Sequence, residues 1–153
     1  SVQAYAANGG KVLGICNGFQ ILLEAGLLPG AMKRNDSLHF ISKYHTLKVI
    51  NTDNKFLSLM KRDEIVNIPV AHHDGNYYID ANGLKELEDN NQILLKYCDK
   101  DGNLVNMNGS ISNIAGICNK QKNVFGLMPH PERAIETILG STDGVNMLKG
   151  FLQ

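Results

Sequence analysis

The sequence predicts a layered α/β fold, and three observations lead to this prediction. Of the 153 residues, 43% are hydrophobic and 20% are charged, which suits a globular domain with a substantial core. Segments typical of strands alternate with segments typical of helices, as in layered α/β proteins. A strand, a tight turn and a helix follow one another within residues 11–28. Because no repeat or low-complexity linker interrupts the chain, we expect residues 1–153 to form a single domain.

The first elements are a helix and the strand, turn and helix unit. Residues 1–7 have a helical composition and are followed by the Asn-Gly-Gly of residues 8–10, a signal that ends helices. The apolar run KVLGIC, at 11–16, is typical of a short buried strand of the parallel type. Residues 17–28 place their apolar side chains on one broad face, and the Pro-Gly of residues 29–30 ends this predicted helix.

The middle of the chain is predicted to be rich in sheet, because its apolar runs are short and carry many β-branched residues. The expected elements are strands at 38–42, 45–51 and 64–71, with one or two helical turns at 54–60.

The last third is expected to alternate between helix and strand and to end in helices. A polar stretch at 119–123 separates two apolar runs, which predicts a hairpin. The expected elements are a helix at 81–90, a strand at 92–98, a turn at 101–102, the hairpin of 113–118 with 124–128, and amphipathic helices at 131–140 and 143–153.

A cysteine occupies the turn of the strand, turn and helix unit. Gly14, Cys16 and Gly18 have the spacing of a nucleophile elbow, where a sharp turn needs small residues beside the reactive side chain. The unpaired N–H groups of the helix N-terminus favour a thiolate, and the N–H of Asn17 is available to a developing oxyanion. Cys16 is therefore predicted to be a nucleophile, whereas Cys98 and Cys118 fit the ordinary role of buried core cysteines.

A cysteine nucleophile needs a base and a group that orients the base. In MPHPERA, His130 and Glu132 are two residues apart and are stiffened by two prolines. In an extended backbone these side chains point to the same side, so Glu132 could hold the imidazole of His130. Cys16 as nucleophile, His130 as base and Glu132 as the orienting group would then form a catalytic triad. The Pro-Glu pair has another reading, because Pro followed by Glu also starts ordinary helices.

The remaining patterns exclude several other functions. Basic and acidic residues both number 15, without a basic cluster, so we expect no nucleic-acid binding. No apolar stretch approaches the roughly 20 residues that span a membrane, and residues 1–10 lack a signal-peptide pattern, so we expect a cytoplasmic protein without membrane contact. There is no phosphate-binding loop and no metal-ligand spacing; the His-His-Asp of residues 72–74 is expected to be a loop.

The motifs GKVLGICNGFQILLEAGLLPGA, RNDSLHFIS, PVAHHDGNYY, NGSISNIAGICN and NVFGLMPHPERAIE resemble those of the class I (triad-type) glutamine amidotransferases, over essentially the whole chain. Within that family they are similar to the glutaminases that serve purine biosynthesis. The resemblance implies a three-layer, flavodoxin-like α/β fold with a largely parallel central sheet and extra antiparallel strands. It also implies that residues 1–153 are the C-terminal part of such a domain, with its N-terminal strands missing.

The resemblance also implies roles for individual residues. It makes Cys16 the nucleophile, His130 the general base and acid, Glu132 the residue that orients His130, and Gln20 a contact of the substrate glutamine. Glutamine would be hydrolysed to glutamate and ammonia through a γ-glutamyl thioester.

The implied partners are a synthetase subunit and a small accessory subunit. The synthetase would use the ammonia to convert formylglycinamide ribonucleotide to formylglycinamidine ribonucleotide. ATP and magnesium are expected on the synthetase, so this chain is expected to bind no cofactor or metal. The loops at 71–75 and 108–110 are candidates for partner docking.

Two alternatives to this function remain open. Members of the family carry an additional N-terminal half with a Gly-Gly loop that supplies a second oxyanion donor, and losing one such donor typically costs about 10²–10³ in rate. Residues 1–153 alone are therefore expected to be weakly active or inactive, which leaves a binding subunit without activity as one alternative. The other is a cysteine hydrolase acting on esters or peptides, because the elbow does not specify the substrate.

Overall fold

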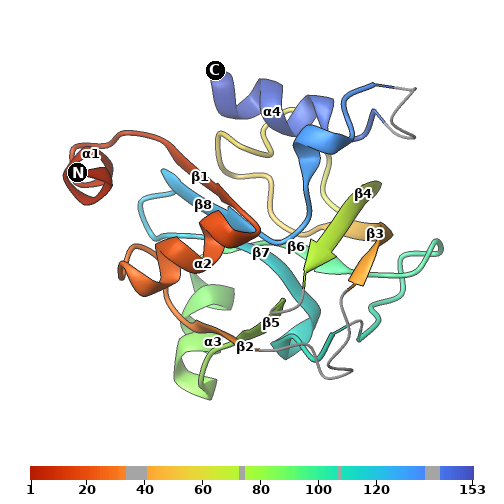
Figure 1. Cartoon of the computed structure of the whole chain (residues 1–153), viewed down its shortest axis with the longest axis horizontal. Helices are drawn as coiled ribbons and strands as arrows, with labels where there is room; N and C mark the ends of the chain where they lie inside the picture. The colour runs from red at the N-terminus through yellow and green to blue at the C-terminus, as the bar shows by residue number, and fades with distance from the viewer. Residues whose placement is uncertain (34–40, 73–74, 107, 137–141) are drawn as a thin grey trace.

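A six-stranded sheet with helices packed on both faces forms the centre of the computed structural model (Figure 1). The structure describes residues 1–33, 41–72, 75–106, 108–136 and 142–153. Its elements are α1 (Val2–Ala7), β1 (Val12–Ile15), α2 (Asn17–Glu24), β2 (Ala31–Lys33), β3 (Ile41–Val49), β4 (Ile65–His72), β5 (Asn76–Tyr78), α3 (Ala81–Asp89), β6 (Ile93–Tyr97), η1 (Ile111–Asn113), β7 (Ile114–Cys118), β8 (Val124–Leu127), η2 (Pro131–Arg133) and α4 (Val145–Leu152), where η marks a short 3₁₀ turn.

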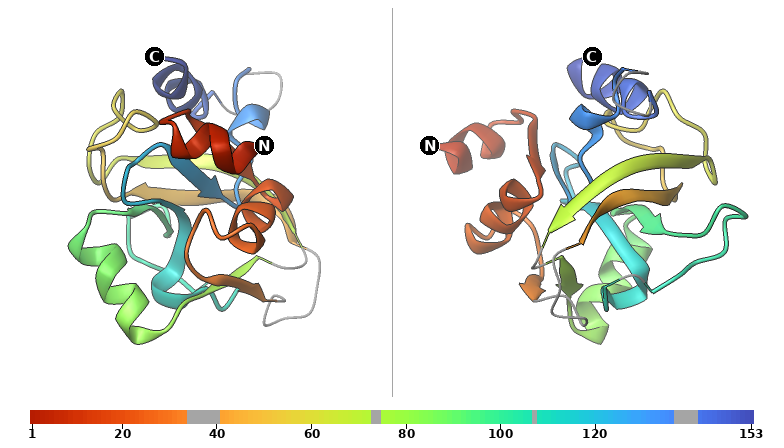
Figure 2. Two further views of the ribbon diagram at one scale, coloured as in Figure 1. Left: turned by 90° about the vertical axis from the view of Figure 1, so that its left-hand side faces the viewer. Right: turned by 45° about the vertical axis from the view of Figure 1, so that its right-hand side comes forward.

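The strands of the main sheet lie in the order β1-β8-β7-β6-β3-β4, and β2 pairs with β5 in a separate ribbon (Figure 2). The strand β1 runs parallel to β8, with Ile15 opposite Leu127. The other neighbours in the main sheet are antiparallel. The predicted α/β class is confirmed. Among the described strands the parallel share is smaller than expected, because the short polar link at 119–123 joins β7 to β8 as a hairpin.

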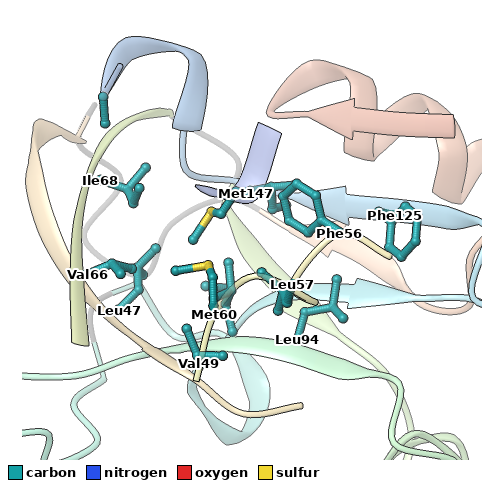
Figure 3. Close-up of a cluster of buried hydrophobic side chains, with 14 of the residues drawn as sticks. Leu47, Val49, Phe56, Leu57, Met60, Val66, Ile68, Leu94, Phe125 and Met147 are labelled. Atoms are coloured by element: carbon teal, nitrogen blue, oxygen red, sulfur yellow. The ribbon is translucent and has the colours of Figure 1, made fainter. Parts of the chain in front are cut away.

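Two hydrophobic cores lie on the two faces of this sheet. On one face, Met147 of α4 packs with Phe56, Phe125 and strand residues such as Leu47 (Figure 3). On the other face, α2 and α3 bury a second cluster that includes Phe19 and Leu87 of these helices. Neighbouring residues of β7 enter different cores, as the pleat of a strand requires. This alternation holds the sheet between its two covering layers.

One predicted helix and one pair of predicted strands differ in the structure. The expected helix at 131–140 is wrong in its described part, which is only the short turn η2. The carbonyl of Ala134 accepts a hydrogen bond from the N–H of Gly144, ten residues further along the chain, at 2.8 Å. The one or two helical turns expected at 54–60 appear as a run of turns, in which the Asn54 Oδ1 accepts the Leu57 N–H at 2.9 Å and the Leu57 carbonyl accepts the Met60 N–H at 3.0 Å.

The structure also differs from the two separate strands that were expected at 38–42 and 45–51. The structure has one continuous strand, β3, in their place, while residues 34–40, with the Asn-Asp-Ser of the motif RNDSLHFIS, lie outside the described residues. The three-residue strands β2 and β5 were not predicted, because runs this short carry no periodic signal.

Asn123 ties the N-terminal helix to the sheet, and its loss should destabilise the protein. Its side-chain amide donates to the carbonyls of Ala6 at 2.8 Å and Gly10 at 2.9 Å. Asn123→Ala leaves both carbonyls without these donors, so we expect the free energy of unfolding to fall by about 1–3 kcal/mol in urea titrations. Asn146→Ala, at an exposed position of α4, is the matched control and should change it by less than about 0.5 kcal/mol. Equal effects of the two variants would contradict this role.

Candidate active site

Cys16 lies at the sharp turn between β1 and α2, as the elbow pattern predicts. Its backbone has φ 56° and ψ −109°, a conformation that residues with a side chain rarely adopt. The turn is fixed on both sides: the Cys16 N–H donates to the Leu127 carbonyl at 2.8 Å, and the Gln20 N–H donates to the Cys16 carbonyl at 3.3 Å. Strain of this kind costs about 1–3 kcal/mol and persists where surrounding structure imposes it, which is typical of functional turns.

Only one of the two glycines beside Cys16 is required by packing. A Cβ atom at Gly14 would lie 2.7 Å from the Gly18 carbonyl oxygen and 2.5 Å from the Leu22 Cδ1, inside contact distance. A Cβ atom at Gly18 would meet no described atom within 4 Å. The steric argument for small residues on both sides of the elbow is therefore correct for Gly14 and wrong for Gly18.

The elbow does not lower the pKa of the Cys16 thiol below its ordinary value. Burial raises its pKa, and this effect outweighs the backbone N–H of Asn17 and the positive charge of Arg133, which lower it. The negative charge of Glu132 raises the pKa further. The Asn17 N–H at the helix N-terminus does favour the thiolate, as expected, but desolvation of the sulfur is the larger effect and the net shift of the pKa is upward. The thiol needs a base to become a nucleophile.

The best-placed base is His130, the third residue after the end of β8. The backbone N–H of His130 donates to the Pro69 carbonyl at 2.8 Å, and the side chain of His130 is largely buried. The Nδ1 atom lies 2.7 Å from the Glu132 Oε1. The Nε2 atom is buried and has no hydrogen-bond partner among the described residues. In the tautomer whose Nδ1 carries the proton, Nδ1–H donates a hydrogen bond to the Glu132 carboxylate. The Nε2 atom is then the nitrogen that can accept a proton.

The pairing of His130 with Glu132 depends on a turn rather than on an extended backbone. Pro131 begins η2, a single 3₁₀ turn that places the Glu132 carboxylate beside the ring of His130. The contact expected from the His-x-Glu spacing is therefore present, although the backbone that forms it differs from the one predicted.

The topology of the sheet brings the three residues to one edge. Cys16 directly follows β1, and His130 and Glu132 follow β8, the parallel neighbour of β1. Carboxyl ends of parallel strands meet at the same edge. The charge of Glu132 acts on the Cys16 pKa, as expected for groups in one site. The described residues thus combine a thiol, a buried imidazole and a carboxylate that holds the imidazole.

Gln20 lies one helical turn beyond Cys16. It lines a hollow of about 270 Å³ together with Glu24, Gly30, Ala31 and Met32. Its Nε2 atom is 3.5 Å from the Glu24 Oε1, a long contact.

The other candidate residues lie elsewhere or serve the fold. Cys98 and Cys118 are buried in the core, as predicted, and burial raises the pKa of both thiols. Asn108 and Ser110 are also buried and both donate to the Gly75 carbonyl, which leaves these two side chains little exposed area for docking a partner. Residues 73–74 lie outside the described residues.

Neither a metal cluster nor a membrane helix is found in the described part of the chain. Its His, Cys, Asp and Glu side chains form no group of three or more that could hold a metal ion. None of its helices has the length and apolar character needed to cross a bilayer.

Sequence reasoning misses two residues near the site. Arg133 falls within a predicted helix start, although its charge acts on Cys16. Tyr97 falls within a predicted apolar strand, although the charge of Cys16 acts on its hydroxyl. The second residue is found only when the strand order is known, because β6 is far from β1 in sequence.

Arg133 should set the pH at which the Cys16 thiol becomes reactive. Because its charge lowers a pKa that burial raises, Arg133→Ala should raise that pKa and shift iodoacetamide alkylation of Cys16 to higher pH. Arg133→Lys keeps the charge and should retain the wild-type profile more closely. Peptide mapping at each pH separates Cys16 from the buried Cys98 and Cys118. An alanine profile identical to the wild-type profile would contradict the effect of this charge.

Comparisons with known proteins agree in the type of domain. Residues 1–146 match the CobB/CobQ-like glutamine amidotransferase domain. The chain is 71% identical to a phosphoribosylformylglycinamidine synthase subunit PurQ of Sulfurimonas denitrificans, over all of this chain and 68% of that protein. It is 61% identical to the subunit of the same name in Wolinella succinogenes, over 99% of this chain and 67% of that protein.

A solved structure gives the same result. The structure of PurLQS from Thermotoga maritima matches with a TM-score of 0.85 at 40% identity, over 99% of this chain and 65% of that one. The chain thus spans about two thirds of the length of the proteins it matches.

Proposed function

Because the chain belongs to the family of CobB/CobQ-like glutamine amidotransferases, we propose that it acts as the glutaminase subunit of a phosphoribosylformylglycinamidine synthase. The relatives of this name and the match to PurLQS support the proposal. The observation that carries it is structural: a strained cysteine and a buried histidine, His130, that is hydrogen-bonded to Glu132 lie at the carboxyl ends of two neighbouring parallel strands.

Acylation begins when His130 takes the proton of the Cys16 thiol. Glu132 stabilises the imidazolium that forms. The thiolate then attacks the side-chain amide carbon of glutamine, and the backbone N–H of Asn17, which hydrogen-bonds Cys16, donates to the oxyanion in this proposal. When the C–N bond breaks, its electron pair stays on nitrogen and His130 returns a proton. The products are a γ-glutamyl thioester and neutral ammonia.

Deacylation uses the same residues in the reverse sense. His130 takes a proton from a water molecule as that water attacks the thioester carbon. The C–S bond then breaks, glutamate is released, and Cys16 recovers its proton from His130. In this scheme Gln20 contacts the bound glutamine from the first turns of α2.

The partners follow from the same assignment. The ammonia passes to a synthetase subunit that makes formylglycinamidine ribonucleotide in purine biosynthesis, in a complex with a small accessory subunit. ATP and magnesium belong to that synthetase, while this chain binds neither. The domain comprises residues 1–153. No disulfide joins Cys16, Cys98 and Cys118, which suits the reducing cytoplasm as the location.

Substrate choice tests this function against a cysteine hydrolase of another kind. We expect the full-length protein to release glutamate from glutamine and to be alkylated at Cys16 by a glutamine-like electrophile. Ester and peptide analogues without the γ-amide should be neither cleaved nor able to protect Cys16. Cleavage of those analogues in preference to glutamine would favour the hydrolase. A Cys16 that reacts no faster than an ordinary free thiol, with no glutamate formed, would favour a binding subunit without activity.

A further inference from the structure

Residues 130–134, here called the catalytic turn, are fixed to the strand β4 at the end of the described sheet. The His130 N–H donates to the Pro69 carbonyl at 2.8 Å. Two residues earlier on the same strand, the Asn67 N–H donates to the Asp143 Oδ2 at 2.7 Å. Alternate residues of an antiparallel edge strand turn their backbone groups away from the sheet, as Asn67 and Pro69 do here. One strand edge therefore anchors both the catalytic turn and a residue just before α4.

Gly144 contacts the catalytic turn from its other side, where the start of α4 lies against η2 (Figure 1). The Gly144 N–H donates to the Ala134 carbonyl at 2.8 Å. A Cβ atom at Gly144 would overlap the Pro131 carbonyl oxygen and lie 2.8 Å from the Pro131 carbonyl carbon. Gly144 has φ −78°, which any residue can adopt, so the close approach and not the conformation requires glycine. Gly144 thus packs directly on the residue between His130 and Glu132.

The carboxylate of Glu132 depends on the backbone of this turn for its position. Its side chain is partly exposed. Among the ion pairs of the described residues, it contacts His130 at 2.7 Å and Arg133 at 4.0 Å, and both partners belong to the same turn. These contacts do not tie the carboxylate to another part of the fold. The backbone anchors at Pro69 and Gly144 therefore decide where the turn places it.

We propose that Asp143 and Gly144 are positioning residues for the reaction, because they hold the catalytic turn so that Glu132 stays beside Nδ1 of His130. This inference rests on the proposed glutaminase function. In that reaction His130 moves a proton in both acylation and deacylation, and Glu132 stabilises the imidazolium each time. A displaced turn loses this stabilisation in the transition states but not the binding of glutamine. Loss of either anchor should therefore lower kcat and leave KM nearly unchanged.

Gly144→Ala tests the packing anchor in the full-length protein. The new methyl group pushes Pro131 away, and a displacement of about 1 Å can cost roughly 10²-fold in rate. We expect kcat for glutamine hydrolysis to fall by about 10- to 100-fold, with KM within about 2-fold of the wild type.

Gly150→Ala is the matched control in the same helix. Its methyl group would lie 2.7 Å from the carbonyl oxygens of Lys55 and Phe56, which are not part of the catalytic turn. Both glycine variants should unfold at lower urea concentration, because both are overpacked against backbone atoms. Only Gly144→Ala should lose kcat, so the comparison separates positioning from stability.

Asp143 tests the anchor on β4 with a milder change at an exposed position. Asp143→Ala removes the acceptor of the Asn67 N–H and should lower kcat by about 2- to 10-fold, the value of one hydrogen bond. Asp143→Asn keeps an oxygen acceptor and should restore most of the lost activity. These two variants decide the question if Gly144→Ala does not fold.

Four results would each overturn the positioning role. They are an unchanged kcat in Gly144→Ala or in Asp143→Ala, equal losses of kcat in Gly144→Ala and Gly150→Ala, a change confined to KM, and no recovery of activity in Asp143→Asn. Wild-type protein that forms no glutamate would instead overturn the proposed function, and the positioning role with it.

Discussion

Replacing Cys16 with alanine is expected to lower kcat for glutamine hydrolysis by about 10⁴- to 10⁶-fold, the size of effect seen when a covalent nucleophile is removed. Without the sulfur no thioester forms, and His130 can only assist direct attack by water. Steady-state assays of glutamate formation measure the loss. The control is Cys98→Ala, which removes a buried thiol outside the site and should retain kcat within a few fold.

Two inactive variants at position 16 should differ in stability, and this difference measures the backbone strain at Cys16 independently of its role in catalysis. Cys16 has φ 56° and ψ −109°, which glycine adopts without steric cost and alanine does not. Both Cys16→Gly and Cys16→Ala remove the nucleophile, but the glycine variant should be more stable by about 1–2 kcal/mol. Denaturant titration of the two inactive proteins makes the comparison. Equal stabilities would mean that the elbow is not strained, which contradicts the geometry on which the nucleophile assignment depends.

Replacing Gly14 with alanine should damage both stability and activity. The new methyl group would overlap the Gly18 carbonyl oxygen and the side chain of Leu22, so β1 and α2 must move apart. Such overpacking typically costs about 1–3 kcal/mol. Because Cys16 lies between these two elements, its sulfur moves with them, and a displacement of about 1 Å can cost roughly 10²-fold in rate. Urea titration and glutaminase assays on one sample measure both losses.

Gly18→Ala is the paired control for this prediction. A methyl group there meets no described atom within 4 Å, and alanine favours the helical conformation of α2 by up to about 1 kcal/mol over glycine. We expect unchanged or higher stability and a kcat close to that of the wild type. If both substitutions are harmless, packing at the elbow does not position the sulfur. If both are equally harmful, the distinction between the two glycines is wrong.

Much of the fold could be predicted from sequence, because its elements carry local signals. The glycines after α1, the polar link of the β7–β8 hairpin and the apolar faces of α2 and α3 all act within a few residues. The failure at 131–140 has the opposite cause. Its Pro-Glu start is a sound local signal, but the Ala134 carbonyl accepts the N–H of Gly144, a contact that no local pattern reveals.

The candidate site was predictable in its residues but less so in its electrostatics. The elbow spacing and the His-x-Glu spacing are enough to identify Cys16, His130 and Glu132 as candidates. The prediction of an ionised Cys16 thiol misses the upward shift of its pKa, because the sulfur is desolvated against the core cluster that includes residues of α2 and α3, which the local sequence does not reveal. Tyr97 was missed for a related reason: its place near Cys16 follows from the strand order and not from the sequence around it.

Mass spectrometry of the protein quenched in acid during turnover of glutamine tests the central assignment most directly. We expect a glutamyl group on the peptide that contains Cys16, none on the peptides of Cys98 and Cys118, and no adduct in Cys16→Ala. A glutamyl group on a different residue, or glutamate formation that persists undiminished in Cys16→Ala, would contradict the assignment of Cys16 as the nucleophile.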